Sequence, residues 1–211
     1  MRKILYLTLL LTVTIFGSFE SDILQITSKV KQRILEGNSW KKGCPVPLTD
    51  LRYLRIKHIN FHGEDQMGEM IVHKEVSVEV TKIFEALYNS DYPIKKMKLV
   101  SSYKGSDWQS IESDNTSAFN CRKATGSKKW SKHSYGKAID INPIENPYIS
   151  RKGYISHKAS SVYRQRVHKK STYADKAVLL KNDQAVQIFK RHGWKWGGDW
   201  SGVKDYQHFS K

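Results

Sequence analysis

Two short stretches of the chain contain residues whose types and spacing suit metal chemistry. The first, SKHSYGKAIDIN, places His133 and Asp140 seven residues apart. An imidazole and a carboxylate are common zinc ligands, although a structural hydrogen bond between the two side chains would fit this stretch equally well. The second stretch places Asp205 and His208 in the spacing D-x-x-H, which puts both side chains on one side of a turn or helix. The second stretch therefore favours a metal site.

A hydrolytic zinc site needs three protein ligands and one nearby carboxylate that is not a ligand. Three ligands leave the fourth position for water, whose pKa falls toward about 7 on the metal. The free carboxylate accepts the proton of that water and later delivers it to the leaving amine. A structural zinc site normally has four protein ligands, and the two cysteines of this chain are too few for an all-cysteine site. The combination of residues therefore favours catalysis.

The elements around the first stretch must bring its histidine and aspartate together. Alternation in GKAIDIN places Ala138, Asp140 and Asn142 on one face of a strand, and the two isoleucines on the other. Gly136 and the β-branched isoleucines argue against a helix. We therefore expect a tight bend ending at Gly136, with His133 just before it.

Hydrophobic periodicity elsewhere predicts a single α+β domain with a mostly antiparallel sheet and flanking helices. A length of 211 residues suits one domain with a substantial core. Ser21 and Asp22 are the expected caps of the first helix. The expected helices are 21–37, 75–89 and 182–192, and the expected strands are 51–61, 69–73, 93–103, 118–122 and 136–142.

The chain is strongly basic, with a formal net charge of +16. Such a charge indicates a polyanionic partner, which could be nucleic acid, an anionic membrane surface or an acidic wall polymer. The segment 150–173 contains seven Lys or Arg residues and no acidic residue. We interpret it as a basic insertion that is either a solvated loop or an arm that binds an anionic polymer.

The N-terminus has the pattern of a secretory signal. Arg2 and Lys3 precede an apolar run to Phe16, and Gly17 and Ser18 follow it. We predict a signal peptide over residues 1–18, with an uncleaved anchor as the alternative. The rest of the chain would then work in the periplasm, or outside the cell in contact with the wall, where nucleic acid is not an expected partner.

The two cysteines, Cys44 and Cys121, are candidates for one disulfide. An even number of cysteines in an exported protein permits a bridge, and two buried free thiols are the alternative.

Beyond these arguments, the chain resembles a known family. SKHSYGKAIDIN fits the S-x-H-x-x-G-x-A-x-D motif of the zinc D-alanyl-D-alanine carboxypeptidase and L-alanyl-D-glutamate peptidase family, which includes vancomycin-resistance D,D-peptidases and phage endolysins. GCPVPLTDLRYLRI, GEMIVH, TSAFNCR and WGGDW…DYQHF are also similar to its carboxypeptidase-like branch, so the resemblance covers about residues 39–210. It implies a zinc peptidase domain over 19–211 with the D-Ala-D-Ala peptidase fold shared with hedgehog domains. The zinc site would lie in a cleft on the sheet.

Carried over residue by residue, the resemblance implies one zinc ion per chain, held by His133, Asp140 and His208, with Asp205 as the catalytic base. The D,D-dipeptidase branch has Glu where this chain has Asp205, whereas endolysin-like members often have Asp. This difference weakens a substrate assignment copied from the dipeptidases but does not affect the metal ligands.

Other positions match family residues that contact the substrate. Arg122 matches an arginine that would hold the polarised carbonyl oxygen or a substrate carboxylate. Ser131 matches a motif serine that either touches the substrate or caps the bend. Trp196 and Trp200 are expected to form a wall of the cleft, with core packing as the alternative.

The resulting expectation is an exported, monomeric zinc peptidase that cuts the peptide stems of bacterial peptidoglycan. A D-alanyl-D-alanine carboxypeptidase is the leading interpretation, followed by an L-alanyl-D-glutamate endopeptidase. A protein of another class, which binds wall or polyanion without catalysis, is the alternative to both.

Overall fold

The computed structural model of the protein describes residues 17–169 and 171–211. The predicted signal peptide lies almost entirely outside these residues and stays a prediction. In the described part of the chain, no helix is long and apolar enough to cross a membrane.

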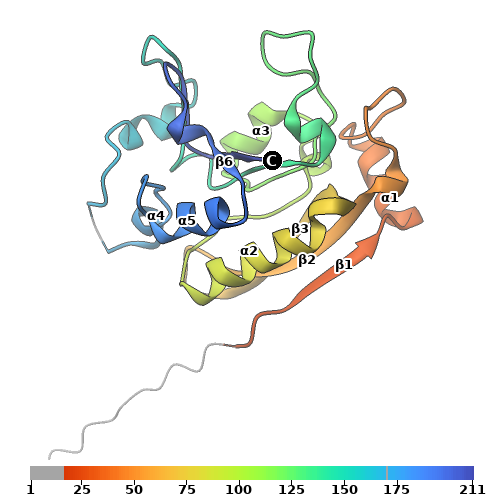
Figure 1. Cartoon of the computed structure of the whole chain (residues 1–211), viewed down its shortest axis with the longest axis horizontal. Coiled ribbons are helices and arrows are strands. Elements are labelled where there is room, and N and C mark those ends of the chain that lie inside the picture. The colour runs from red at the N-terminus through yellow and green to blue at the C-terminus, as the bar shows by residue number, and fades with distance from the viewer. Residues whose placement is uncertain (1–16, 170) are drawn as a thin grey trace, which may run out of the picture.

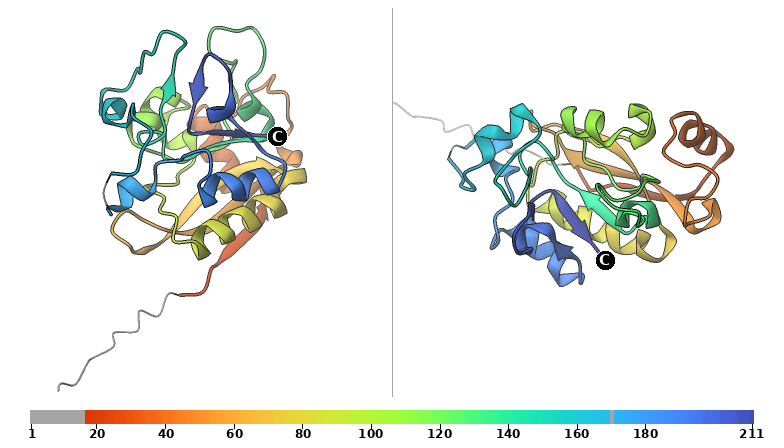
Figure 2. Two further views of the ribbon diagram at one scale, coloured as in Figure 1. Left: turned by 60° about the vertical axis from the view of Figure 1, so that its left-hand side comes forward. Right: turned by 90° about the horizontal axis from the view of Figure 1, so that it is seen from above.

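The described residues form an α+β domain with three small antiparallel sheets and flanking helices (Figures 1 and 2). The predicted fold class is therefore confirmed at this level, whereas the hedgehog-type fold stays a prediction. The first sheet has the order β1-β2-β3, with β1 (Ser21–Gln25), β2 (Leu51–Ile59) and β3 (Asp65–His73). The second has the order β4-β8-β6, with β4 (Ala138–Asp140), β8 (His208–Ser210) and β6 (Lys195–Trp196). The third pairs β5 (Tyr148–Ile149) with β7 (Lys204–Asp205). The α-helices are α1 (Ser28–Glu36), α2 (Ser77–Asn89), α3 (Asp107–Glu112), α4 (Tyr173–Lys176) and α5 (Gln184–Arg191).

The hairpin of β2 and β3 buries side chains on both of its faces. Leu54 and Ile56 of β2 pack in one apolar cluster with α2, which lies across the sheet in Figure 1. Leu51 and Tyr53 point the other way and pack in a second cluster with α1. This period-2 alternation follows from the pleat of a strand. The predicted hairpin and the predicted helix 75–89 are both confirmed.

The sheet β4-β8-β6 packs into the first of these clusters and carries the candidate site. Ile139 of β4 is paired with Phe209 of β8, and neither side chain is exposed to solvent. The Phe209 ring stacks on Phe189 of α5, with 3.9 Å between the ring centroids. The predicted helix over 182–192 is thus confirmed, and its apolar side packs against β8 in the core.

The predicted helix over 21–37 begins later than expected, and the prediction that Ser21 and Asp22 cap it is wrong. Residues Ser21–Gln25 form β1, which pairs antiparallel with β2. The helix starts after Thr27, whose hydroxyl accepts a hydrogen bond from the backbone N–H of Val30. The apolar residues of 21–25 have helical spacing, but backbone pairing with the edge of β2 makes this segment a strand.

The predicted strand over 93–103 is wrong, because its backbone amides bond to side chains. The N–H of Lys95 donates to Asn142 Oδ1 at 3.0 Å, and that of Lys98 donates to Asn115 Oδ1 at 2.8 Å. Only isolated bridges form, and the segment ends in a 3₁₀ turn over Val100–Tyr103.

The predicted strand over 118–122 is also wrong. The N–H groups of Phe119 and Cys121 donate to the carbonyls of Ile71 and Ser39, which lie in two different segments, so no ladder forms. The strand expected over 136–142 is real but shorter, since Asn142 has φ of 42° and turns out of β4.

Cys44 and Cys121 are joined by a disulfide, as predicted. It closes a loop with a sequence separation of 77 and lies in the cluster beneath α1.

We expect the double replacement Cys44→Ser with Cys121→Ser to lower the free energy of unfolding by about 4 kcal/mol, because the unfolded chain regains the entropy of this long loop. Urea denaturation of the oxidised protein and of the double variant measures the difference. A difference below about 1 kcal/mol would show that the bridge adds little to stability.

Two carboxyl groups, those of Asp114 and Glu145, are buried together. Glu145 is hydrogen bonded to Asp114, and burial together with that neighbour raises the pKa of Glu145 to about 9. The folded protein therefore holds a proton that the unfolded chain releases above about pH 4.5. The resulting stabilisation is complete below that pH and is lost as the pH rises toward 9.

We expect Glu145→Gln to remove much of this pH dependence. The variant should exceed the wild type in free energy of unfolding by about 1–3 kcal/mol at pH 8, with a smaller difference or none at pH 5. Urea denaturation at both pH values measures this, with the exposed Glu36→Gln as the control. Equal stability of the variant and the wild type at pH 8 would contradict the shared proton.

Candidate metal centre

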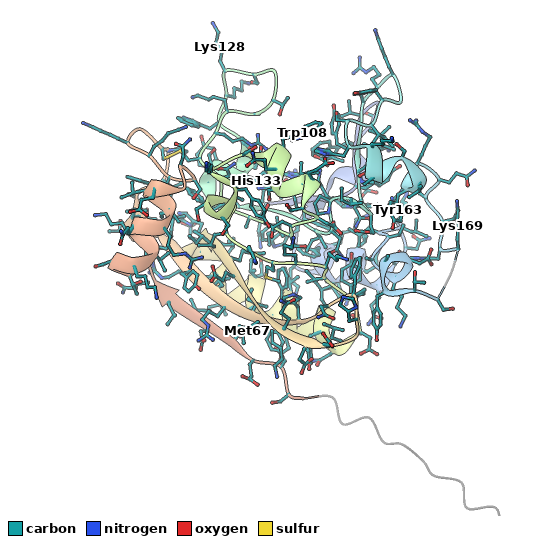
Figure 3. The ribbon with its side chains drawn as sticks, turned by 180° about the vertical axis from the view of Figure 1, so that it is seen from behind. Met67, Trp108, Lys128, His133, Tyr163 and Lys169 are labelled. Atoms are coloured by element: carbon teal, nitrogen blue, oxygen red, sulfur yellow. A yellow bond between two sulfur atoms is a disulfide. The ribbon has the colours of Figure 1, made fainter. Side chains whose placement is uncertain are left out.

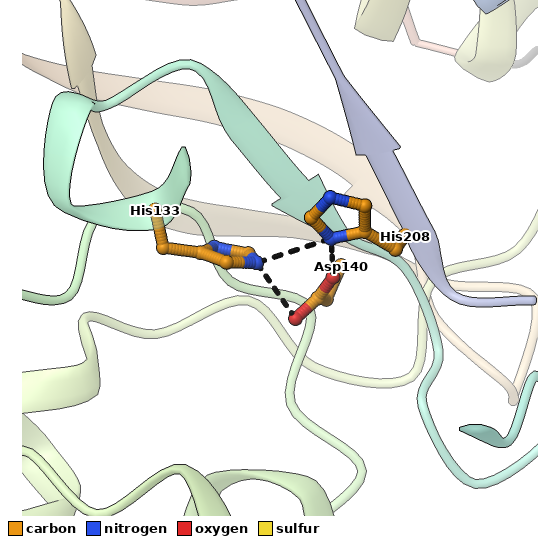
Figure 4. A group of neighbouring side chains, drawn as sticks. All are labelled: His133, Asp140 and His208. Atoms are coloured by element: carbon orange, nitrogen blue, oxygen red, sulfur yellow. Dashed lines mark hydrogen bonds and ion pairs between the residues drawn. The ribbon is translucent and has the colours of Figure 1, made fainter. Parts of the chain in front are cut away.

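Three side chains from distant parts of the chain converge on one point (Figure 4). His133 Nε2 lies 3.1 Å from Asp140 Oδ2 and 3.3 Å from His208 Nδ1, and His208 Nδ1 lies 3.0 Å from Asp140 Oδ1. Each of the three residues offers one atom that could bind a metal ion, and in the described part of the chain these three atoms all lie within 4.8 Å of one another. The sequence prediction that these residues come together is confirmed.

The register of the sheet explains why two of the three meet. Asp140 of β4 is directly opposite His208 of β8, and side chains of directly paired residues lie on the same face of an antiparallel sheet. The other faces of both strands carry Ile139 and Phe209, which are buried in the core. Core packing therefore orients the carboxylate and the imidazole toward the same side.

A tight turn brings the third residue to them. His133 lies in a 3₁₀ turn over Lys132–Tyr135, which ends at Gly136 with φ of 65°. A Cβ at this glycine would lie 2.5 Å from the backbone nitrogen of His73, so no larger residue fits without moving β3. The predicted bend before Gly136 is confirmed, and it folds His133 back over Asp140.

A hydrogen bond selects the nitrogen that His133 presents to the centre. Its Nδ1 lies 2.5 Å from the carbonyl oxygen of Ala118, which can only accept, so Nδ1 carries the proton. Nε2 of the neutral ring is then a lone-pair donor that faces the other two residues. A carbonyl partner on the outer nitrogen is the usual way in which a metal-binding histidine is oriented.

The geometry of the three atoms fits zinc. Bonds of about 2.0–2.1 Å in a tetrahedron place neighbouring ligand atoms about 3.3 Å apart, close to the three distances here. Two imidazole nitrogens and a carboxylate oxygen are all accepted zinc ligands. Three electron-pair donors in such close contact also call for a cation between them.

Charge in the centre is strongly coupled. Burial lowers the pKa of His133, but the neighbouring Asp140 outweighs it and holds that pKa above its usual value. Burial likewise raises the pKa of Asp140, but the two imidazoles hold it far below the ordinary range. Asp140 therefore stays ionised and holds a positive charge, either protons or a metal ion, at the centre.

Asp205 lies beside the centre without belonging to the group of three. It ends β7 and is separated from His208 in β8 by the turn residues Tyr206 and Gln207. Gln207 Nε2 donates a 3.1 Å hydrogen bond to Asp205 Oδ1. Burial and the nearby Asp140 raise the pKa of Asp205 to about 6. This carboxylate is thus mostly ionised at neutral pH and a stronger base than an ordinary aspartate.

Arg122 is positioned by residues that the sequence did not connect with it. Its Nε forms an ion pair with Asp107, at the start of α3, and Asp107 also accepts a 2.7 Å hydrogen bond from Asn120. Burial lowers the pKa of Arg122, while the charges of Asp140 and Asp205 raise it, which places its guanidinium within electrostatic reach of the centre. An arginine at this position remains charged.

The predicted substrate contacts have different outcomes. Ser131 Oγ accepts a 3.3 Å hydrogen bond from the N–H of His133, so it caps the turn that carries this residue, and its contact with substrate stays a prediction. Trp200 is 37% exposed, and its ring centroid lies 5.5 Å from that of His208. Trp196 is buried and donates to the carbonyl of Tyr206, so of its two predicted roles, cleft wall and core packing, the second is confirmed.

Sequence reasoning did not identify three groups that orient the site. The Ala118 carbonyl, Asp107 and Gln207 act on His133, Arg122 and Asp205 respectively. Gln207 lies inside the D-x-x-H motif, and that position was the one available signal. The other two partners lie 15 residues from the groups they contact, and no local pattern marks them.

The comparison with family models gave one match. A model described as D-alanyl-D-alanine carboxypeptidase matches residues 125–211. The C-terminal part of the chain is therefore similar to this peptidase family. The matched residues include all three members of the centre and Asp205, whereas Arg122 and both cysteines lie before them. No curated protein and no solved structure matched the chain.

The match to this peptidase family indicates a hydrolase, and the structure contains a group of residues that can hold a metal ion. Two hollows, of about 490 and 290 Å³, lie elsewhere on the surface, and neither is lined by a member of the centre. The cleft expected around the site therefore stays a prediction.

Proposed function

We propose that the protein is an exported zinc peptidase that removes the terminal D-alanine from peptide stems of bacterial peptidoglycan. The observation that carries this proposal is the convergence of His133, Asp140 and His208 with Asp205 beside them, within the residues that match the peptidase family. The family description supports the D-alanyl-D-alanine bond as the substrate.

The three converging residues would hold one zinc ion through His133 Nε2, His208 Nδ1 and a carboxylate oxygen of Asp140. Bound zinc supplies Lewis-acid chemistry, which makes a carbonyl more electrophilic and water more acidic. The protein orients these ligands through the Ala118 carbonyl and through the pairing of β4 with β8.

Asp205 would carry the proton transfers. It accepts a proton from the attacking water and then donates a proton to the nitrogen of the departing D-alanine. Gln207 holds one of its oxygens, which leaves the other free for this exchange.

Arg122 would bind a negative charge of the substrate. Its guanidinium is held by Asp107 on one side and is attracted by the acidic residues of the centre on the other. A free carboxylate at the end of a peptide is a suitable partner, since a guanidinium pairs with it through two parallel hydrogen bonds. This preference favours an enzyme that acts on the last residue of a stem.

The net charge of +16 supports a wall polymer as the environment, because such polymers are anionic. The predicted signal peptide supports export to the periplasm or the outside of the cell.

Mass spectrometry of defined muropeptides after incubation with the zinc-loaded protein tests the proposal. Loss of a single alanine from a pentapeptide stem is the expected result. Release of the stem after its first alanine would instead identify an L-alanyl-D-glutamate endopeptidase, which the aspartate at position 205 would suit. Binding of muropeptides without any cleavage would identify a non-catalytic wall-binding protein.

A further inference from the structure

One arginine of the basic segment 150–173 differs from the other cationic residues described there. The side chain of Arg166 is partly buried, and its Nε has no contact with solvent, whereas the neighbouring Arg164 is exposed. Figure 3 shows the segment on one flank of the domain, with Tyr163 and Lys169 labelled. The segment is therefore neither a uniformly solvated loop nor a free arm.

The guanidinium of Arg166 joins several segments of the chain. Nη1 donates to the carbonyls of Glu145 at 2.6 Å and Tyr163 at 3.2 Å. Nη2 donates to Asn146 Oδ1 at 2.7 Å and to the carbonyl of Leu179 at 3.0 Å. These contacts use four donor positions of one planar fork, which a lysine cannot reproduce.

The same guanidinium packs on the ring of Tyr206, which lies in the turn between Asp205 and His208. Arg166 Cζ is 4.4 Å from the centroid of the Tyr206 ring, which is cation–π contact distance. Tyr206 follows Asp205 directly, and its carbonyl accepts a 2.8 Å hydrogen bond from Trp196 Nε1. Tyr206 is therefore held by a core tryptophan through its backbone and by Arg166 through its ring.

The backbone that follows Asn146, a hydrogen-bond partner of Arg166, also pairs with this turn. Tyr148 of β5 is paired with Asp205 of β7, and the N–H of Tyr206 donates to the carbonyl of Pro147 at 3.3 Å. Asn146, which accepts from Arg166, comes directly before these residues, and its own side chain donates to the carbonyl of Ile141 after β4. One hydrogen-bonded unit thus links Arg166 to Ile141, which follows β4, and to Asp205 and Tyr206, which precede β8.

No carboxylate within the described residues forms an ion pair with Arg166. Burial lowers its pKa to about 10, so the side chain is still charged at neutral pH. Partial burial of such a charge costs free energy that carbonyls and one aromatic ring must offset. A solvated insertion would not need a buried, hydrogen-bonded arginine. The contact of Arg166 with Tyr206 therefore points to a role for this arginine in the site.

We propose that Arg166 is a positioning residue, which holds the Asp205–His208 turn in place by clasping the backbone of 145–146 and packing on the Tyr206 ring. Residues outside the recognised motifs thereby set the distance between the base and the metal ligand. The proposal rests on the proposed function only where it names Asp205 as the base.

The test compares Arg166→Gln with Arg164→Gln in the full-length protein as purified. Arg164 lies in the same segment, and its replacement by glutamine removes the same charge. Its guanidinium donates to the Gly153 carbonyl and has no described contact with the turn. We expect Arg166→Gln to speed amide hydrogen exchange in residues 204–208 by at least about tenfold, with exchange in β2 and β3 unchanged. On muropeptide we expect kcat to fall about 10–100-fold, because small displacements of a catalytic group have effects of this size. KM should stay within about twofold.

Variants of the ring keep the test valid if Arg166→Gln folds poorly. Tyr206→Leu should reproduce faster exchange in 204–208 and the loss of kcat, while Tyr206→Phe, which keeps the ring, should behave like the wild type. Arg166→Lys, which keeps the charge but loses the fork, should also lower kcat. The double variant Arg166→Gln with Tyr206→Leu should be no worse than the poorer single variant, because both act through one contact.

The inference is overturned if exchange in 204–208 matches that of Arg164→Gln, or if the two losses in kcat simply multiply. The exchange measurement does not depend on activity. If the wild type cleaves no muropeptide while Arg166→Gln still loosens the turn, the proposed function fails and the positioning role stands.

Discussion

Replacement of Asp205 by alanine is expected to abolish peptide hydrolysis while the protein keeps its zinc. Asp205 lies outside the group of three converging ligand atoms, so its loss leaves the metal-binding geometry intact. Its carboxylate has a pKa raised to about 6 and, in the function proposed above, moves protons between water and the leaving amine. Loss of a general base typically costs about 10²–10⁴-fold in rate. Kinetics on muropeptide together with elemental analysis of the purified variant measure both quantities.

Three further variants define the role of this carboxylate. Asp205→Asn keeps the shape and the hydrogen bond with Gln207 but cannot accept a proton, so it should be as inactive as Asp205→Ala. Asp205→Glu restores a base at slightly different reach and should recover part of the rate. Asp199→Asn, which removes an acidic residue paired with Lys190 in the same part of the chain, should keep full activity. Loss of zinc from Asp205→Ala would show that Asp205 is a ligand and that the assigned roles are wrong.

The second large effect is expected from the metal ligands. His133→Ala, Asp140→Asn and His208→Ala each remove one of three donor atoms, and two donors do not fix a zinc ion in tetrahedral geometry. Changes at residues that merely orient ligands already weaken binding by about 10–100-fold, so we expect losses of more than about 100-fold here. Hydrolysis should disappear together with the metal.

Thermal unfolding measures this binding without reference to activity. At a zinc concentration about 100 times the dissociation constant, the metal should add about 2.7 kcal/mol to the stability of the wild type. The three ligand variants should show little or no stabilisation, whereas His62→Ala, a change at an exposed histidine, should show the full effect. Equal stabilisation of wild type and His208→Ala would show that the metal binds elsewhere.

Much of the candidate site could be predicted from local sequence. His133 and Asp140 lie in one stretch, and both the bend at Gly136 and the alternation of isoleucines with polar residues are encoded within a few positions. The D-x-x-H spacing likewise brings Asp205 and His208 to one turn. The hairpin of β2 and β3 and the helices α2 and α5 could be predicted for the same reason, since their periodic apolar residues mark the buried sides.

The failures occurred where distant contacts decided the backbone. Residues 21–25 have helical spacing, but pairing with β2 makes them a strand. The run 93–103 has strand-like composition, but Asn142 and Asn115 take up its amides. Trp196 is an aromatic residue near the D-x-x-H motif, which suits a cleft wall, but it is buried in the core against the ring of Tyr206.

By itself, the sequence determined which chemistry these side chains suit, because the ligand and proton-transfer properties of His133, Asp140, His208 and Asp205 belong to the side-chain types. Only the tertiary structure decided how these groups are held. The pairing of Asp140 with His208, the contact of Asp107 with Arg122 and the clasp of Arg166 on Tyr206 join residues 15 to 68 positions apart. Contacts of this kind depend on the packing of the whole domain, and no local spacing records them.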